Sequence, residues 1–288
     1  MLVLHDGNPL VHIRRAWVNQ TIVVLILLVF LAQTFDLFFW PRFAFFPLQL
    51  IHGLDEPGPL QGIVGLVTHI FLHGSWLHLL GNLIALWVFG DNIEDAMGHF
   101  RYLLFFFVCG IAAALAQAFL GDPRIPMIGA SGAVSAVMGA YLLLHPRARV
   151  LMLAFNVVPI LAPAALVVGA DIMLNAYMAW EAAHSIRGLA NSEAAGIAWW
   201  AHIGGFVAGM ALIAVLRRRD VALFQPAPAA AGRTLSWVAR FIPTLAWRGE
   251  RPVGDEADAP AKFRNDRWMV FVKALIYVVL IFVLTRVL

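Results

Sequence analysis

The pattern of apolar and polar positions along the chain predicts seven helices that cross a membrane. Long apolar runs alternate with polar connections. A helix needs about 20 apolar residues to cross roughly 30 Å of hydrocarbon, at about 1.5 Å per residue. Two of the apolar runs are shorter, which suits a recessed site that water can reach. The predicted segments are residues 20–40, 76–90, 101–120, 131–145, 157–180, 197–216 and 268–288.

These segments predict an all-α polytopic membrane protein with four parts. Residues 1–19 form a polar cytoplasmic leader, and residues 20–217 contain six of the seven helices. Residues 218–267 include Pro- and Ala-rich stretches and read as a cytoplasmic linker to a last helix at 268–288. Residues 41–75 make a long connection rich in Pro and aromatic residues, which we expect to lie in the outer membrane interface.

Composition supports a membrane protein and excludes several other classes. The chain is 61% hydrophobic and only 13% charged, with a mean hydropathy of +0.81, whereas soluble domains are about 25% charged. The pI of 9.4 accompanies a formal charge of only +3 and no basic patch interleaved with aromatics, so we expect no nucleic-acid partner. Cys109 is the only cysteine, so neither an intramolecular disulfide nor a Cys-ligated metal site can form.

The distribution of Lys and Arg predicts the orientation of the chain. Fifteen of these residues fall in connections on one face of the membrane and four on the other, which places the N-terminus in the cytoplasm. The second, fourth and sixth helices then all enter from the non-cytoplasmic side. Their first turns carry four polar side chains into one leaflet, namely His78, Asn82, Ser131 and His202.

Ser131 stands at the start of the fourth helix, in the sequence Gly129-Ala130-Ser131-Gly132. Small residues allow helices to approach closely in lipid. A serine at a helix start is also an ordinary N-cap. This motif alone therefore leaves both a nucleophile and a structural cap open.

His202 stands near the start of the sixth helix and is followed by Gly205 and Gly209, which give that helix a flat face. A serine nucleophile needs a base that takes its proton and later returns it to the leaving amine. A lone histidine near a helix end can instead be an interfacial side chain. Because no acidic third member is evident, a dyad of Ser131 and His202, in a protease that works inside the bilayer, is the economical interpretation.

His78 and Asn82 lie four residues apart and share a helical face. Both can donate hydrogen bonds to the oxyanion of acyl transfer. The rival interpretation is a metal site, because His69 and His73 have i, i+4 spacing. However, the chain has no adjacent His-His pair, and Ile70 replaces the Glu of a His-Glu-x-x-His zinc motif. We expect no metal and no other cofactor, and purely structural histidines remain a third possibility.

Asp171 and Asn175 form another polar pair, four residues apart in the fifth helix. Ionisable groups inside membrane helices are functional candidates by default. A hydrogen bond to a neighbouring helix explains the pair equally well, so its role stays open.

In combination and order, these motifs resemble those of the rhomboid family of intramembrane serine proteases, over about residues 20–217. The resemblance implies a six-helix bundle with Ser131 as nucleophile and His202 as base. It also implies an oxyanion hole formed by the Ser131 backbone N–H, His78 and Asn82. The elements that carry it are Gly129-x-Ser131-Gly132, Ala201-His202-x-x-Gly205-x-x-x-Gly209, His69-x3-His73-x4-His78-x3-Asn82, and then Gly90, Glu94 and Gly98.

The resemblance also assigns roles to the remaining segments. Residues 41–75 resemble the lateral, membrane-embedded hairpin of the family, and the fifth helix resembles its substrate gate. The seventh helix resembles that of the six-plus-one variants. The implied partners are transmembrane protein substrates and the lipid bilayer, and the implied location is a bacterial inner membrane, with a multi-pass chain.

The chain departs from the family pattern at three places. Val64 and Gly65 stand where a Trp-Arg pair is common in the first loop. Ser135 stands where an aromatic residue often supports the histidine ring, so the orientation of the imidazole must come from elsewhere. The stretch 181–198 before the sixth helix is long, which predicts a larger cap over the site.

The sequence therefore predicts an intramembrane serine endopeptidase that cleaves transmembrane substrates with a Ser-His dyad. The alternative is a rhomboid-like pseudoprotease that binds membrane clients without cleavage. Such relatives typically lose the serine or the histidine, whereas this chain keeps both Ser131 and His202.

Overall fold

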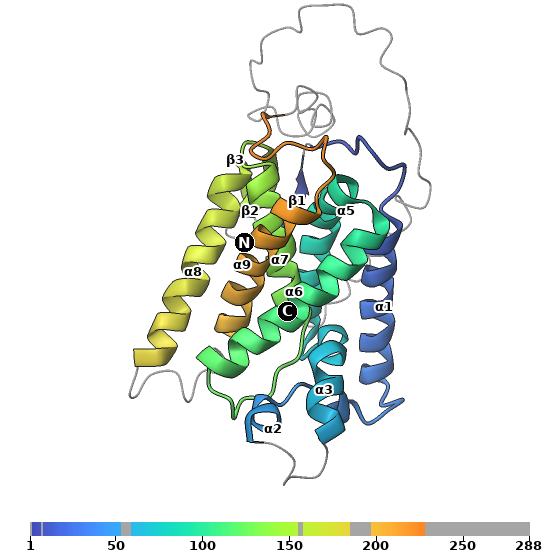
Figure 1. Ribbon diagram of the computed structural model, residues 1–288, viewed down its shortest axis with the longest axis vertical. Helices are drawn as coiled ribbons and strands as arrows, with labels where there is room; N and C mark the ends of the chain where they lie inside the picture. The colour runs from blue at the N-terminus through green and yellow to red at the C-terminus, as the bar shows by residue number, and fades with distance from the viewer. Residues whose placement is uncertain (1, 7, 53–58, 155–157, 185–196, 228–288) are drawn as a thin grey trace, which may run out of the picture. The chain divides into compact units, whose positions relative to one another are not determined.

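A computed structural model describes residues 2–6, 8–52, 59–154, 158–184 and 197–227. Within this part, helices lie at six of the seven predicted positions (Figure 1). The seventh predicted helix, 268–288, and most of the predicted linker fall outside the described residues. The long helical segments are α1 (Trp17–Thr34), α4 (Trp76–Ala85) continued through η3 (Leu86–Gly90) into α5 (Asp91–Met97), α6 (His99–Leu120), α7 (Ser131–Leu144), α8 (Ala164–His184) and α9 (Trp199–Leu216).

Among the described residues, three helices are long and apolar enough to cross a membrane, namely α1, α6 and α9. The helical pair Gly62–Phe71 and Trp76–Met97 is bent by 80° and makes a fourth candidate if it is counted as one span. Helix α7 is apolar but has only 14 residues. The seven crossings expected from the sequence therefore stay a prediction.

The connection at 41–75 contains short helices where the sequence predicts a loop. They are η1 (Trp40–Phe43), α2 (Pro47–His52), α3 (Pro59–Thr68) and η2 (His69–Phe71). Figure 1 shows α2 and α3 at one end of the bundle, away from the end where α1 begins and α9 ends.

The fold also contains a small sheet, which the prediction of an all-α chain misses. Strands β1 (Leu2–Asp6), β2 (Arg149–Ala154) and β3 (Val158–Pro163) are antiparallel in the order β1-β2-β3. The prediction that the fifth helix starts at residue 157 is therefore wrong, because α8 starts at Ala164. Proline disfavours helical backbone in the residue before it, and the prolines at 159 and 163 fall within β3.

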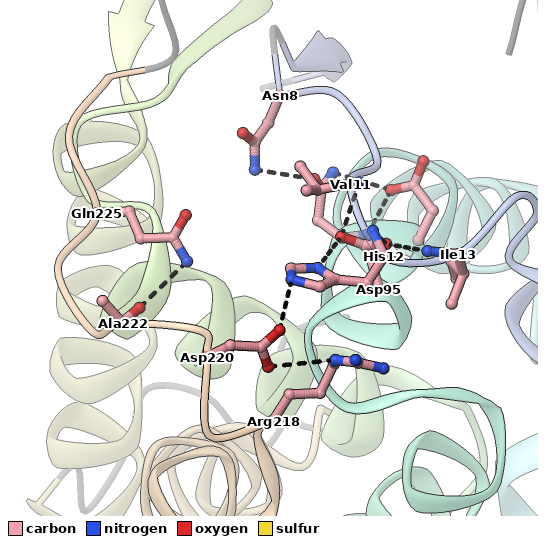
Figure 2. A network of polar contacts seen from close by, with 11 residues as sticks. Asn8, Val11, His12, Ile13, Asp95, Arg218, Asp220, Ala222 and Gln225 are labelled. Atoms are coloured by element: carbon pink, nitrogen blue, oxygen red, sulfur yellow. Dashed lines mark hydrogen bonds and ion pairs between the residues drawn. The ribbon is translucent and has the colours of Figure 1, made fainter. Parts of the chain in front are cut away.

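The polar leader, residues 1–19 of the sequence, contacts the helical domain. Its strand β1 pairs with β2, and its next segment wraps the Asp95 carboxylate on α5. Asp95 accepts backbone N–H bonds from Val11, His12 and Ile13 at 3.0, 2.7 and 2.7 Å. Figure 2 shows the His12 ring between Asp95 and Asp220, whose carboxylate lies 3.5 Å from its Nε2 atom. The leader thus joins α5 to the chain that follows α9.

One acidic residue on α5 holds the start of α1. The first N–H groups of a helix have no partner within the helix and favour negative charge. Glu94 accepts hydrogen bonds from the N–H groups of Val18 and Asn19 at 3.1 and 2.7 Å. Gly90 allows this approach, because a Cβ at that position would lie 2.2 Å from the Asn19 side-chain oxygen.

Helices α7 and α9 pack backbone against backbone, as the glycine spacing predicts. A Cβ at Gly205 would lie 2.0 Å from the Gly132 carbonyl oxygen, and one at Gly209 would lie 2.1 Å from that of Ala136. Real Cβ atoms do not tolerate such distances, so both positions need glycine. The close approach brings the starts of the two helices together.

Replacing Gly209 with alanine is expected to destabilise the fold. The new methyl group must displace the backbone of α7, and overpacking of this kind costs about 1–3 kcal/mol. Gly169→Ala in α8 is the matched control, because a Cβ at that position would meet nothing within 4 Å and alanine favours helix by up to about 1 kcal/mol. Thermal unfolding in detergent should show a lower midpoint for Gly209→Ala only. Equal midpoints for the two variants would contradict the tight packing of α7 on α9.

Candidate active site

The turn that leads into α7 requires a glycine. Gly129 has a φ of +116°, a backbone conformation that side-chain-bearing residues rarely adopt. A Cβ there would also lie 2.6 Å from Cε1 of His78. The Gly129 N–H donates to the His69 carbonyl at 2.8 Å, which fixes the turn. The imidazole of His78 therefore lies against the backbone just before Ser131.

The structure brings Ser131 and His202 within hydrogen-bond distance. The Nε2 atom of His202 lies 2.8 Å from the Oγ atom of Ser131, although the two residues are 71 positions apart in the chain. Both side chains are half-buried. Ser131 is the first residue of α7 and His202 lies in the first turn of α9. Their contact follows directly from the close packing of α7 and α9.

His202 has a second partner that was not predicted from the sequence. Its Nδ1 atom lies 2.6 Å from the Oδ1 atom of Asn175 on α8. Trp199 adds an edge contact, with ring centroids 5.9 Å apart. The only sequence signal was the polar pair that Asn175 forms with Asp171 in a membrane helix.

His78 and Asn82 lie on the same side of α4, as their spacing predicts. Ser75 is the N-cap of α4, and its hydroxyl accepts the His78 backbone N–H at 3.2 Å. The Nδ2 atom of Asn82 lies 2.9 Å from Nε2 of His73. The rings of His73 and His78 meet edge to face at 5.0 Å. An amide nitrogen carries two hydrogens, so Asn82 has a second N–H besides the one that faces His73.

The histidines that suggested a metal site have protein partners here. His69 is buried, with its Nδ1 atom 2.8 Å from the Gly65 carbonyl oxygen. His73 lies against Asn82, and Gln33 hydrogen-bonds its backbone at both ends. In the described part of the chain, no group of three or more His, Cys, Asp and Glu side chains is placed to hold a metal ion.

One cavity joins the four site residues predicted from the sequence. Its volume is about 1190 Å³, and its lining includes His78 and Asn82 from α4, Ser131 from α7, Asn175 from α8 and His202 from α9. Its lining also includes largely apolar side chains of α4 and α8, and Val3 of β1. The space beside Ser131 is therefore part of a largely apolar cavity.

The first loop is anchored without a Trp-Arg pair. Gly65 packs against the preceding backbone, because a Cβ there would lie 2.6 Å from the Ala44 carbonyl oxygen. Phe45 and Met127 exchange two backbone hydrogen bonds of 3.0 and 2.8 Å. These bonds tie the loop to the segment that leads to Ser131.

Comparison with known proteins agrees with this architecture. A family model described as the Rhomboid domain matches residues 61–219, more than half of the chain. Rhomboid protein 1 of Saccharomyces cerevisiae mitochondria is 29% identical over 154 residues, which cover 51% of this chain and 40% of that protein. The mitochondrial RHOMBOID-like protein 12 of Arabidopsis thaliana is 33% identical over 126 residues, covering 38% of this chain and 37% of that protein.

A bacterial relative is similar over a shorter stretch. Rhomboid protease GluP of Bacillus subtilis is 40% identical over 77 residues, which cover 27% of this chain and 15% of that protein. The matched region thus spans well under two thirds of the length of each of these relatives. The apolar helices and the domain match identify a membrane-embedded protein. The chain belongs to the rhomboid family.

Proposed function

We propose that this protein is an intramembrane serine endopeptidase that cleaves transmembrane protein substrates with a Ser131–His202 dyad. The observation that supports it most is the 2.8 Å separation of Ser131 Oγ and His202 Nε2. A hydroxyl within this distance of an imidazole can pass its proton to the ring as it attacks. No cofactor enters this chemistry.

The proposed reaction runs through an acyl-enzyme. Ser131 Oγ attacks the carbonyl carbon of the scissile peptide bond, and its proton moves to His202 Nε2. The imidazolium then gives that proton to the leaving amine as the C–N bond breaks. A water molecule, deprotonated by the same nitrogen, hydrolyses the ester and frees Ser131.

The oxyanion of the tetrahedral intermediate needs hydrogen-bond donors that are already in place. We assign the backbone N–H of Ser131, at the start of α7, together with the side chains of His78 and Asn82. All three residues line the same cavity, and the helix dipole favours negative charge at the start of α7. The contact with His73 supports this role for Asn82, because it holds the amide in place.

We also propose that the N-terminus lies in the cytoplasm. The excess of Lys and Arg on one side supports this orientation. The leader, the β2–β3 hairpin and the residues after α9 gather at one end of the bundle, as connections on a common side should (Figure 1). Because relatives occur in mitochondria as well as in a bacterium, assignment to a bacterial inner membrane rests on the sequence prediction alone.

Reconstitution tests the proposal. The purified full chain in liposomes should cut a model single-span substrate, with mass spectrometry placing the cut within or near the transmembrane segment. EDTA should leave the rate unchanged, since the proposed chemistry uses no metal. A folded wild-type protein that binds the substrates but never cuts them would favour the alternative of a client-binding pseudoprotease.

Asn82→Ala is expected to slow turnover without abolishing it. Removing one oxyanion donor typically lowers kcat by about 10²–10³-fold, and the Ser131 N–H and His78 remain. The loss should appear in kcat more than in KM, because the oxyanion exists only near the transition state. Steady-state kinetics in liposomes measure this split.

The control for Asn82→Ala is its thermal stability, since Asn82 is a buried polar residue with a hydrogen-bond partner. A variant with wild-type kcat and only a lowered melting temperature would reduce Asn82 to a structural role. Such a result would remove it from the oxyanion hole.

A further inference from the structure

His202 has a second hydrogen-bond partner, at the ring nitrogen that does not face Ser131. We propose that Asn175 on α8 is a positioning residue that fixes the tautomer and the orientation of His202, and that Asp171 in turn fixes the amide of Asn175. This inference rests on the proposed function, because it concerns the same base. It assigns a role to a polar pair that a Ser-His dyad leaves unused.

The orientation of the Asn175 amide follows from its contacts with Asp171. Its Nδ2 atom lies 2.8 Å from the backbone carbonyl oxygen of Asp171 and 3.1 Å from the Oδ2 atom of the same residue. A backbone carbonyl oxygen can only accept a hydrogen bond. The amide nitrogen must therefore face Asp171, which leaves the amide oxygen to face His202.

The tautomer of His202 follows in turn. An amide oxygen only accepts, so at 2.6 Å from Asn175 Oδ1 the Nδ1 atom of His202 must carry a hydrogen. A neutral imidazole holds one such hydrogen, so Nε2 keeps its lone pair. That lone pair faces Ser131 Oγ at 2.8 Å. The hydrogen bonds from Asp171 through Asn175 to His202 thus select the tautomer that can accept the serine proton.

Asn175 also helps to orient the imidazole of His202. Ser135, one turn after Ser131 on α7, has a short side chain that offers the His202 ring no aromatic face. The His202 ring instead has hydrogen bonds at both nitrogens and an edge contact with Trp199. Asn175 is only 7% exposed.

The three residues come from three different helices. Ser131 and His202 belong to α7 and α9, which pack tightly together, whereas Asn175 belongs to α8. A displacement of α8 would therefore release His202 Nδ1 without separating the serine from the histidine. The ability of His202 to act as a base therefore depends on the position of α8 beside α9.

Two variants at Asn175 test the kinetic consequence. Asn175→Ala, and Asn175→Leu as a variant of similar volume, should lower kcat by about 10²-fold, the size expected when a reacting group is misplaced. KM should stay near the wild-type value, and covalent labelling of Ser131 by a fluorophosphonate should slow in parallel. Met173→Ala is the matched control, because Met173 lies on α8 but is 74% exposed.

A conservative variant at Asp171 supplies a contrast. Asp171→Asn leaves the backbone carbonyl that accepts from Asn175 Nδ2 unchanged and still offers a side-chain oxygen beside that nitrogen. Its kcat should lie within about tenfold of the wild-type value, less than the roughly 10²-fold loss expected for a misplaced group. A merely structural Asn175 would lower melting temperatures without this difference in kcat between the Asn175 and Asp171 variants.

Nitrogen NMR reads the tautomer directly and does not depend on any variant at Asn175. In ¹⁵N-histidine-labelled protein, the His202 signals, identified by their loss in His202→Ala, should show a protonated Nδ1 and an unprotonated Nε2 at neutral pH. The opposite tautomer, or an even mixture, would overturn the inference. So would wild-type kcat in folded Asn175→Ala. If the wild-type protein itself neither cut substrate nor reacted with the probe, the proposed function would fail first.

Discussion

Replacing Ser131 with alanine is expected to abolish cleavage of a transmembrane substrate while leaving the protein folded and inserted. The hydroxyl that attacks the peptide carbonyl is lost, and removing the nucleophile of a serine protease costs on the order of 10⁶-fold in kcat. Removing this small polar group from the start of α7 costs little stability, because Ala130, not Ser131, is the N-cap residue. Cleavage assays in liposomes, with thermal unfolding in parallel, measure both effects.

A control for Ser131→Ala removes a hydroxyl outside the site. Thr21 lies on the exposed side of α1 and its hydroxyl bonds only within that helix, to the Trp17 carbonyl. Thr21→Ala should cleave substrate at the wild-type rate. Full activity in folded Ser131→Ala would remove Ser131 from the mechanism and with it the dyad.

Replacing His202 with alanine is expected to have an effect of the same order. Without the imidazole at 2.8 Å, the Ser131 hydroxyl keeps its proton and is a weak nucleophile. Because serine and histidine act as a unit, losing either costs about as much as losing both, on the order of 10⁶-fold in kcat. A Ser131→Ala/His202→Ala double variant should therefore be no slower than either single variant.

His184→Ala serves as the matched control for His202→Ala. His184 ends α8, is exposed, and has its ring nitrogen 2.8 Å from the Trp180 carbonyl oxygen in the same helix. Its loss should leave turnover unchanged. Additive losses in the Ser131 and His202 double variant would mean that the two residues act independently, contrary to the dyad.

Part of the site could be predicted from the sequence because its signals are local. Glycines at spacing four in α9 predicted a close approach to the small residues of α7, and the Cβ distances at Gly205 and Gly209 confirm that approach. Once the two helices touch, their starts must meet. The contact between Ser131 and His202 then follows from counting helices.

Other parts depend on contacts that no local pattern encodes. Asn175 reaches His202 only because α8 lies beside α9, and its i, i+4 spacing from Asp171 is equally consistent with a self-contained polar pair. Strand β1 pairs with β2, which lies far along the sequence. The polar leader gave no sign of this pairing or of its contact with the Asp95 carboxylate, because Asp95 lies 82 residues or more away in sequence and β2 lies farther still.

The measurement that tests the central claim most directly is the site and rate of covalent modification by a fluorophosphonate. The purified full chain would be treated in detergent, digested and mapped by mass spectrometry, beside the folded His202→Ala variant. A catalytic dyad predicts one adduct, on Ser131 Oγ, that forms in the wild-type protein and is nearly absent in the variant. An adduct on another residue, or one on Ser131 that forms equally fast without His202, would contradict the assignment of these two residues as nucleophile and base.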